Sequence, residues 1–233
     1  MKAAVMQGNA ESHFARQAAT VPNFDRLARV YRWMEWLTFG PFLSRSRRVF
    51  LPEIRRAGPL RALVIGDGDG RFTAQLLAEN LRVQVDAVDA SRAMLAQLRR
   101  NARHDASRIS LHCADVRAWS AASACYDLIV THFFLDCLTG DEVADLAMRL
   151  KPLASPEALW VVSDFAVPRN RFGRLFAKPL VSFLYLAFRI LTGLNVRRLP
   201  DHRRALHEAG FSLVLAHNSL SGLLVSELWK PVG

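Results

Sequence analysis

Three alternating glycines surround two aspartates in ALVIGDGDGRF, residues 62–72. Apolar residues precede Gly66 and a helix-compatible run follows Gly70, so the stretch predicts a strand, a tight turn and a helix. A helix N-terminus presents free N–H groups to anions and nucleotides, and glycine permits close approach of a ligand. Asp67 and Asp69 would repel a pyrophosphate, so the turn favours a ligand without phosphate.

Two common nucleotide motifs do not fit this loop. A dinucleotide fingerprint needs its third glycine at position 71, which is Arg71, and a P-loop needs a Gly-Lys-Ser/Thr sequence, which is absent. A nicotinamide oxidoreductase would also need a Tyr-x3-Lys pair or a similar polar set, and the chain has neither. The ligand must therefore be inferred from the rest of the sequence.

The elements that position the loop alternate between strands and helices. The pattern predicts strands at 61–65, 82–88, 109–112, 126–131 and 158–164, and helices at 71–79, 92–103 and 141–150. Two further strand-like runs, 211–219 and 222–230, predict a closing hairpin. We therefore expect an α/β fold: a doubly wound, seven-stranded, mostly parallel sheet with an antiparallel final strand.

The pattern of elements along the chain also predicts its domain organisation. We expect a flexible N-terminus at residues 1–20 and a single domain at 21–233. The domain begins with a helical cap at 21–58, whose two helices are separated near Gly40-Pro41, and continues with a ligand-binding core at 59–165. A helical insertion at 166–200 follows, and a final helix with the hairpin occupies 201–233. The apolar run of the insertion is too short to span a bilayer. It predicts a core or dimer helix, or a lid whose flanking basic residues touch an anionic membrane through 171–198.

The composition restricts compartment and partners. The net charge of +10 comes almost entirely from arginine, which favours an anionic partner. Cys113, Cys125 and Cys137 match no zinc spacing and predict buried thiols in a reducing compartment. The N-terminal apolar run is too short for a signal peptide. We expect a cytoplasmic protein, free or peripheral at the inner membrane face, and no metal.

Acidic residues follow the predicted strands, where a doubly wound sheet binds its ligands. Asp89, in AVDAS, follows the second strand about 20 residues after the loop, where a carboxylate can accept from both hydroxyls of a ribose. Asp115, in HCADVR, follows the third strand and can accept from the exocyclic amine of adenine. An adenosine without phosphate is part of S-adenosylmethionine, which we therefore predict as the cofactor.

The motifs GDGDG, VDAS with Met94, CADV and YDLIVTHFF resemble, in order and spacing, those of class I S-adenosylmethionine-dependent methyltransferases over about residues 60–165. The resemblance implies a cofactor site made of Gly66, Asp67, Gly68, Gly70, Asp89, Ala90, Ser91, Met94, Asp115, Val116, Thr131 and His132. The glycines would line the methionine part, Asp115 and Val116 the adenine, and Thr131 the floor near the methyl group. Val64 stands where the family often has an acidic residue.

The N-terminal spacing Phe24-x3-Ala28-x2-Tyr31 resembles the start of the ubiquinone/menaquinone C-methyltransferases. It implies that Tyr31 reaches over the cofactor, although Arg32 and Glu35 replace the Asp and Asn expected there. The predicted acceptor is a small, apolar, quinone-like or lipid-like molecule.

His132 and Asp136 are the predicted catalytic pair, with Tyr31 and Asp164 as further polar candidates. If THFFLDCL begins a helix, residues four apart share a face, and His132 could remove a proton from the acceptor. A hydrogen-bonded histidine and a helix-capping aspartate with no catalytic role is the open alternative.

Other functions remain open at this point. An RNA or protein methyltransferase is one alternative, but nucleic acid is not favoured because the basic residues lack the interleaved aromatics of a single-strand platform. A non-catalytic relative that binds S-adenosylmethionine, or nothing, and acts as an interaction subunit is the other. Val64 is the residue that supports it.

Overall fold

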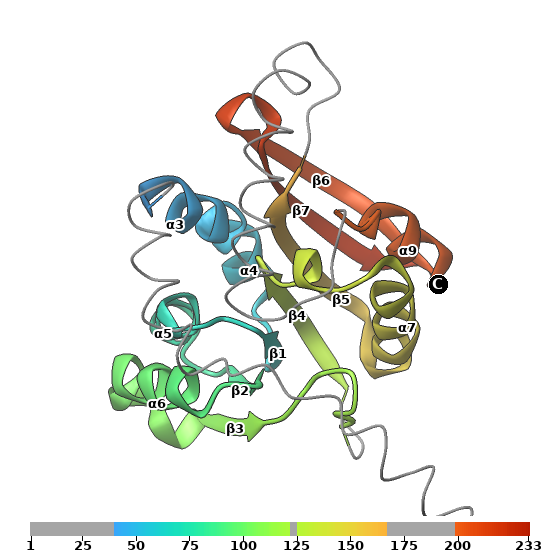
Figure 1. Cartoon of the computed structure of the whole chain (residues 1–233). Coiled ribbons are helices and arrows are strands. Elements are labelled where there is room, and N and C mark those ends of the chain that lie inside the picture. Colours follow the sequence, from blue (N-terminus) through green and yellow to red (C-terminus); the bar gives the residue numbers. More distant parts are fainter. Residues whose placement is uncertain (1–39, 122–124, 167–198) are drawn as a thin grey trace, which may run out of the picture.

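A computed structural model describes residues 40–121, 125–166 and 199–233. Its centre is a seven-stranded sheet in the order β3-β2-β1-β4-β5-β7-β6 (Figure 1). The strands are β1 (Arg61–Ile65), β2 (Gln84–Asp89), β3 (Ile109–Cys113), β4 (Tyr126–His132), β5 (Ala154–Phe165), β6 (Phe211–Ser219) and β7 (Leu224–Pro231). The first five strands pair in parallel, and β7 is antiparallel to both β5 and β6. The predicted fold class is confirmed.

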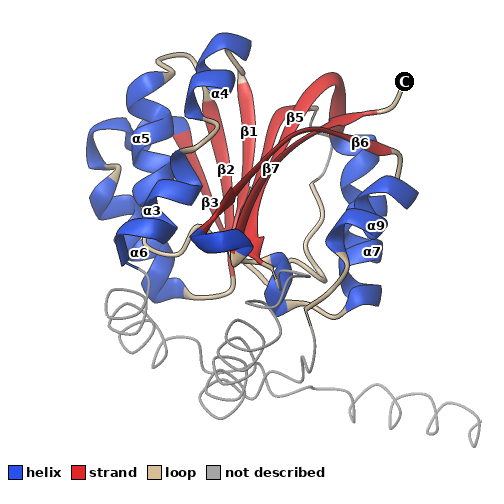
Figure 2. Ribbon diagram, turned by 90° about the horizontal axis from the view of Figure 1, so that it is seen from above, coloured by secondary structure: helices blue, strands red, loops and turns tan. Residues whose placement is uncertain are grey.

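Helices cover both faces of the sheet (Figure 2). On one face lie α3 (Gly40–Arg48), α4 (Leu51–Ala57), α5 (Arg71–Glu79) and α6 (Arg92–Asn101), and on the other α7 (Gly140–Leu150) and α9 (His202–Glu208). Short 3-10 turns complete the described chain: η1 (Arg103–Arg108), η2 (Leu135–Cys137), η3 (Lys151–Leu153) and η5 (Leu220–Gly222).

The central strands are apolar on both sides because helices cover both faces. Val64 of β1 packs in the core beneath α5, and Leu63, its neighbour, packs in the core beneath α7. This double burial explains why the strands appear in the sequence as continuous apolar runs.

A serine clamp joins α3 to the far side of the sheet. The Oγ atoms of Ser163 on β5 and Ser226 on β7 both donate to the carbonyl oxygen of Ser46, at 3.3 and 3.0 Å. Ser226 also accepts from the Oγ of Ser163, at 3.2 Å. The clamp fixes the last turn of α3 against the sheet.

The differences from the expected elements lie at the boundaries. The strand β5 begins at Ala154, four residues before the expected start, and α3 begins at Gly40, where a break was expected. A second break separates α3 from α4, since Phe50 precedes α4 with no side-chain cap and proline follows in its first turn. No helix within the described ranges is long and apolar enough to cross a membrane.

Several predictions fall outside the described residues. These are the flexible segment 1–20, Tyr31, and most of the insertion with its basic flanks at 171–198. They stay predictions, as do the domain boundaries.

Candidate active site

The glycine loop connects β1 to α5, and its three glycines all have positive φ, at 68°, 64° and 75°. A Cβ at Gly66 would lie 2.3 Å from the ring of Phe134, and one at Gly70 would lie 2.3 Å from the side chain of Leu98. A Cβ at Gly68 would meet nothing within 4 Å. Gly66 and Gly70 therefore permit close internal packing, while Gly68 leaves the backbone open to a ligand.

The two loop aspartates bind to the start of α5. Oδ2 of Asp67 accepts from the backbone N–H and the hydroxyl of Thr73, at 2.9 and 2.6 Å, and Oδ1 has no partner among the described residues. Burial raises the pKa of Asp67 to about 6. Asp69 forms an ion pair with Arg71 at 2.8 Å. Oδ1 of Asp67 is thus a buried acceptor available to a bound cation.

Backbone hydrogen bonds bring the ends of the first three strands together. The N–H of Gly66 donates to the carbonyl of Val88 at 2.9 Å, and the N–H of Ala114 donates to the carbonyl of Asp89 at 3.1 Å. The structure thereby places the glycine loop, Asp89 and the segment leading to Asp115 along one edge of the sheet.

The segment after β2 begins α6. The carboxylate of Asp89 accepts from the N–H of Ser91 at 2.8 Å, and Ser91 caps α6 by accepting from the N–H of Met94 at 3.3 Å. Asp89 and Ala90 are half-buried, as is Met94. These contacts hold the side chain of Asp89 at the end of its strand.

Asp115 is bound to Arg117. Its Oδ1 accepts from the N–H and Nε of Arg117, both at 2.9 Å, and Arg117 also pairs with Glu142 at 3.0 Å. The Arg117 guanidinium lowers the pKa of Asp115. Val116 is buried beside it. The carboxylate predicted to bind adenine is therefore already engaged by an internal cation.

Thr131 and His132 end β4 and are both buried. The hydroxyl of Thr131 accepts from Trp160 Nε1 at 3.0 Å. His132 packs edge-on against Phe72, with ring centroids 4.5 Å apart, and neither ring nitrogen has a hydrogen-bond partner in the described part of the chain. Burial, with the nearby charge of Arg47, holds the pKa of His132 well below its usual value. His132 is therefore neutral at physiological pH.

His132 and Asp136 do not form a hydrogen-bonded pair. No helix begins at His132, because Phe133 has a positive φ of 53° and only the short turn η2 contains Asp136. Asp136 instead accepts from the thiol of Cys137 at 3.4 Å, and burial raises its pKa to about 6. The shared helical face expected from the spacing is absent.

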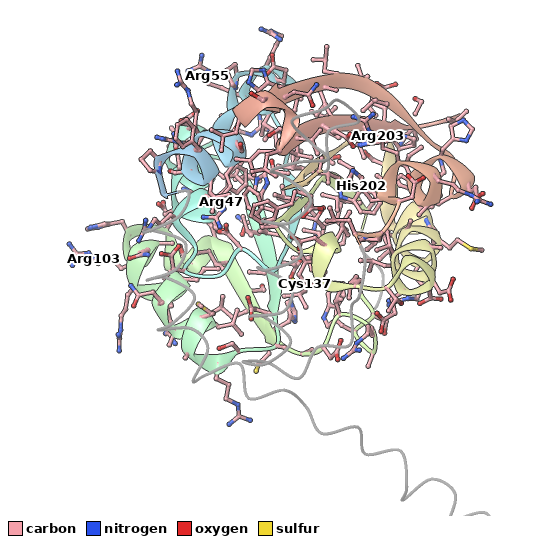
Figure 3. The ribbon with its side chains drawn as sticks, turned by 45° about the horizontal axis from the view of Figure 1, so that its top comes forward. Arg47, Arg55, Arg103, Cys137, His202 and Arg203 are labelled. Atoms are coloured by element: carbon pink, nitrogen blue, oxygen red, sulfur yellow. The ribbon has the colours of Figure 1, made fainter. Side chains whose placement is uncertain are left out.

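Two charged groups at this edge were not predicted. Arg47 of α3, labelled in Figure 3, lies 5.3 Å from the ring centroid of Phe133. Its charge acts on both Asp67 and His132. Glu227 is fully buried in β7 and pairs with His202. A glutamate within the apolar run of β7 was a usable signal, whereas Arg47 is one of several arginines in α3 and nothing in the sequence distinguishes it. No cluster of metal-ligand type occurs within the described ranges.

Part of the chain matches a known protein family. Residues 62–157 match the family described as a methyltransferase domain. No curated protein matches the chain.

Solved structures share the fold at low sequence identity. Mitomycin 7-O-methyltransferase MmcR is similar with a TM-score of 0.60 and 15% identity, over 86% of this chain and 60% of that chain. N-methyltransferase NodS from Bradyrhizobium japonicum WM9, in complex with S-adenosylhomocysteine, has a TM-score of 0.60 and 16% identity over 82% and 88%. The CcbJ methyltransferase from Streptomyces caelestis has a TM-score of 0.60 and 18% identity over 81% and 90%. The chain thus spans about three fifths of the mitomycin enzyme.

Residues 62–157 thus match a methyltransferase domain, and the described fold is shared with methyltransferases of known structure.

Proposed function

We propose that this protein transfers a methyl group from S-adenosylmethionine to a small, apolar, quinone-like or lipid-like acceptor. One observation carries the proposal. The open glycine of the β1 loop, the carboxylate that ends β2 and the neutral histidine that ends β4 lie at the ends of three neighbouring parallel strands.

The residues present fit the cofactor. Gly68 offers open backbone to the methionine part, and the unpartnered Oδ1 of Asp67 offers an acceptor to its ammonium group. Asp89 would accept from the ribose hydroxyls, with Ala90, Ser91 and Met94 beside the adenosine. The adenine would lie against Val116, and Asp115 would accept from its amine in exchange for part of its bonding to Arg117.

His132 would serve as the base. Methyl transfer is an in-line displacement at the sulfonium methyl, so alignment and exclusion of water do most of the work, and a base is needed only where the acceptor loses a proton. Because His132 is neutral and its nitrogens are unpartnered among the described residues, it can accept that proton. Tyr31 remains a proposed acceptor contact from outside the described part.

The apolar character of the acceptor is supported by a cluster beside the end of β4. It comprises Leu43, Phe133, Leu223 and Leu224, with Phe165, Leu199 and Leu220 packed against them. The rings of Phe133 and Phe165 lie 5.4 Å apart. A charged acceptor would lose hydration against such a wall without compensation.

The test is calorimetric titration with S-adenosylhomocysteine, the expected product, which requires no knowledge of the acceptor. We expect binding, and we expect Asp89→Ala to weaken it by about 1.5–3 kcal/mol through loss of charge-assisted hydrogen bonds. Asp86→Asn is the matched control, since Asp86 lies on the same strand but binds His112 and Tyr126. An Asp89→Ala variant with unchanged affinity would contradict the site.

A non-catalytic relative is the second candidate. Val64 is buried in β1, where an acidic residue is frequent in the family, and the carboxylate of Asp115 is held by Arg117. If the wild-type chain fails to bind S-adenosylhomocysteine, this second candidate replaces the first.

A further inference from the structure

The two helix layers of the molecule differ in charge. The helices α3, α4, α5 and α6 contain nine arginines and two acidic residues, whereas α7 and α9 contain three arginines and four acidic residues. All three arginines of α7 and α9 form ion pairs. In the other layer, six arginines in or near α4 and α6 form no ion pair within the described ranges.

These six arginines lie at one edge of the molecule. The helices α4 and α6 end with arginines and lead to the starts of β1 and β3, which flank the start of β2 in the sheet. The N–H of Gln84 donates to the carbonyl of Leu60 at 2.8 Å. Arg108 of η1 donates to the carbonyls of Asn80 and Val83, at 2.9 and 3.3 Å. We call this surface the arginine edge, and its members are all exposed, with two of them labelled in Figure 3: Arg55, Arg56, Arg82, Arg99, Arg100 and Arg103.

The carboxylates near the arginine edge are already bound by other groups. Asp105 pairs with Arg108. Asp86 forms an ion pair with Arg61 at 3.2 Å, and Asp127 accepts from the backbone N–H of Arg61 at 3.1 Å. The arginine edge therefore carries positive charge that no carboxylate of the described chain neutralises by direct contact, which favours an anionic partner.

Apolar side chains lie among these arginines. Leu60 and Leu81 are 46% and 79% exposed, and Leu81 directly precedes Arg82. A hollow of about 250 Å³ is lined by Arg99 together with Ala106, Ile109 and Leu111. Among the described residues, no exposed aromatic side chain lies at this edge. Single-stranded nucleic acid binds by stacking on aromatic rings, whereas aliphatic side chains beside cations suit the surface of a bilayer with anionic lipids.

We propose that the arginine edge docks on an anionic phospholipid membrane. The guanidinium groups would bind lipid phosphates, which they can contact through two parallel hydrogen bonds. Leu60 and Leu81 would enter between the headgroups, and the hollow beside Arg99 would receive the apolar part next to a bound headgroup. The arginine edge lies at the strand starts and the candidate site at the strand ends, so docking leaves the site accessible. The inference goes beyond the proposed function and does not depend on the acceptor.

The test is co-sedimentation of the full chain with vesicles of phosphatidylcholine and phosphatidylglycerol in equal parts, compared with vesicles of phosphatidylcholine alone. We expect binding to the anionic vesicles only, and weaker binding as salt is added. The double variant Arg99→Gln, Arg103→Gln should bind about 25-fold more weakly, because each arginine beside an anionic surface contributes about fivefold. Leu81→Ser should bind about tenfold more weakly through loss of apolar burial.

The matched control is the double variant Arg204→Gln, Lys230→Gln. It removes the same charge from α9 and β7, where Glu208 and Glu157 pair with these residues. It should change the affinity by less than about twofold, because exposed ion pairs contribute little. Equal weakening by the two double variants would mean attraction through net charge alone and would overturn the inference. Equal binding to neutral and anionic vesicles would overturn it too.

Polyuridine RNA tests nucleic acid as the other anionic partner. We expect it to bind more weakly than the anionic vesicles at the same salt concentration, and we expect Leu81→Ser to leave that binding unchanged. Tighter binding to polyuridine than to the vesicles, with no effect of Leu81→Ser on either, would overturn membrane docking. All variants should melt as the wild type and keep its S-adenosylhomocysteine affinity. Failure of the wild type to bind S-adenosylhomocysteine would contradict the proposed function alone.

Discussion

The two halves of the strand-end edge treat their polar groups differently. In the half formed by β1, β2 and β3, the carboxylates bind helix starts or internal cations: Asp67 binds Thr73, Asp89 binds Ser91 and Asp115 binds Arg117. In the half formed by β4 and β5, His132 is buried with no hydrogen-bond partner in the described part of the chain, and Asp164 is buried there without a side-chain donor. The first half is organised by its own backbone, whereas the second holds groups whose desolvation a ligand would compensate.

The largest expected effect comes from Glu227, a fully paired acid on β7, the strand next to β5. Glu227→Ala should reduce the free energy of unfolding by about 3–5 kcal/mol, because it leaves the buried partners His202 and Trp229 without their acceptor. Asp164→Asn, on the same face, should reduce it by less than about 1 kcal/mol because it removes no side-chain hydrogen bond. Urea denaturation measures both. Equal losses would remove the distinction between acids with and without side-chain donors.

The next largest effect lies within the glycine loop. Gly70→Ala should destabilise the fold by about 2–4 kcal/mol, since its Cβ would overlap Leu98 at a positive φ. Gly68→Ala should cost only about 1 kcal/mol, because the φ is positive but the space is open. Among the folded variants, we expect Gly68→Ala to weaken S-adenosylhomocysteine binding more than Gly70→Ala does. If Gly70→Ala lowered both the stability and the S-adenosylhomocysteine affinity more than Gly68→Ala does, Gly68 would be structural too.

The pH dependence of stability tests the buried loop acid. The pKa of Asp67 is raised from 3.8 to about 6, so the folded chain binds more protons than the unfolded chain between these values. Stability should therefore fall as the pH rises from about 4 to 6, by roughly 2 kcal/mol from this group. Asp67→Asn should lose less over the same range, and Asp69→Asn should behave as the wild type. Thermal melting across this range would show a parallel fall in all three if Asp67 were not responsible.

The smallest effect compares two helix caps. Ser91→Ala and Thr139→Ala should each reduce stability by about 1 kcal/mol, because Ser91 caps α6 and Thr139 forms a capping box with Glu142 at the start of α7. Only Ser91→Ala should weaken S-adenosylhomocysteine binding, since α6 lies on the proposed cofactor side. Thr139→Ala affecting that binding equally would argue against a division into two halves.

The sequence predicted the parts of the molecule that depend on local pattern. Apolar runs predicted the strands, and glycines with positive φ marked the loop at residues 66–70, because backbone conformation and burial leave direct traces in residue type. It did not predict the break after His132, where the chain turns at Phe133 with a left-handed backbone that only tertiary contacts stabilise.

The missed contacts join distant parts of the chain. Glu227 meets His202 and Arg203 across 24 or 25 residues, and Arg47 acts on Asp67 and His132 from a helix far upstream. The periodicity of apolar residues in the sequence does not indicate such pairs. The pairing of Asp115 with Arg117 was easier to predict, because an aspartate and an arginine two residues apart can pair locally.

The serine clamp has a consequence for the order in which the chain folds. The carbonyl of Ser46 accepts from Ser163 and from Ser226, a residue 180 positions later, so the complete clamp on α3 needs β7 to be formed. During synthesis the core strands can assemble first, while α3, and with it Arg47, waits for β7, which is made after them. The edge of the candidate site that receives Arg47 is thus completed only after β7 has formed, and a chain shortened before β7 would retain the glycine loop without the arginine beside it.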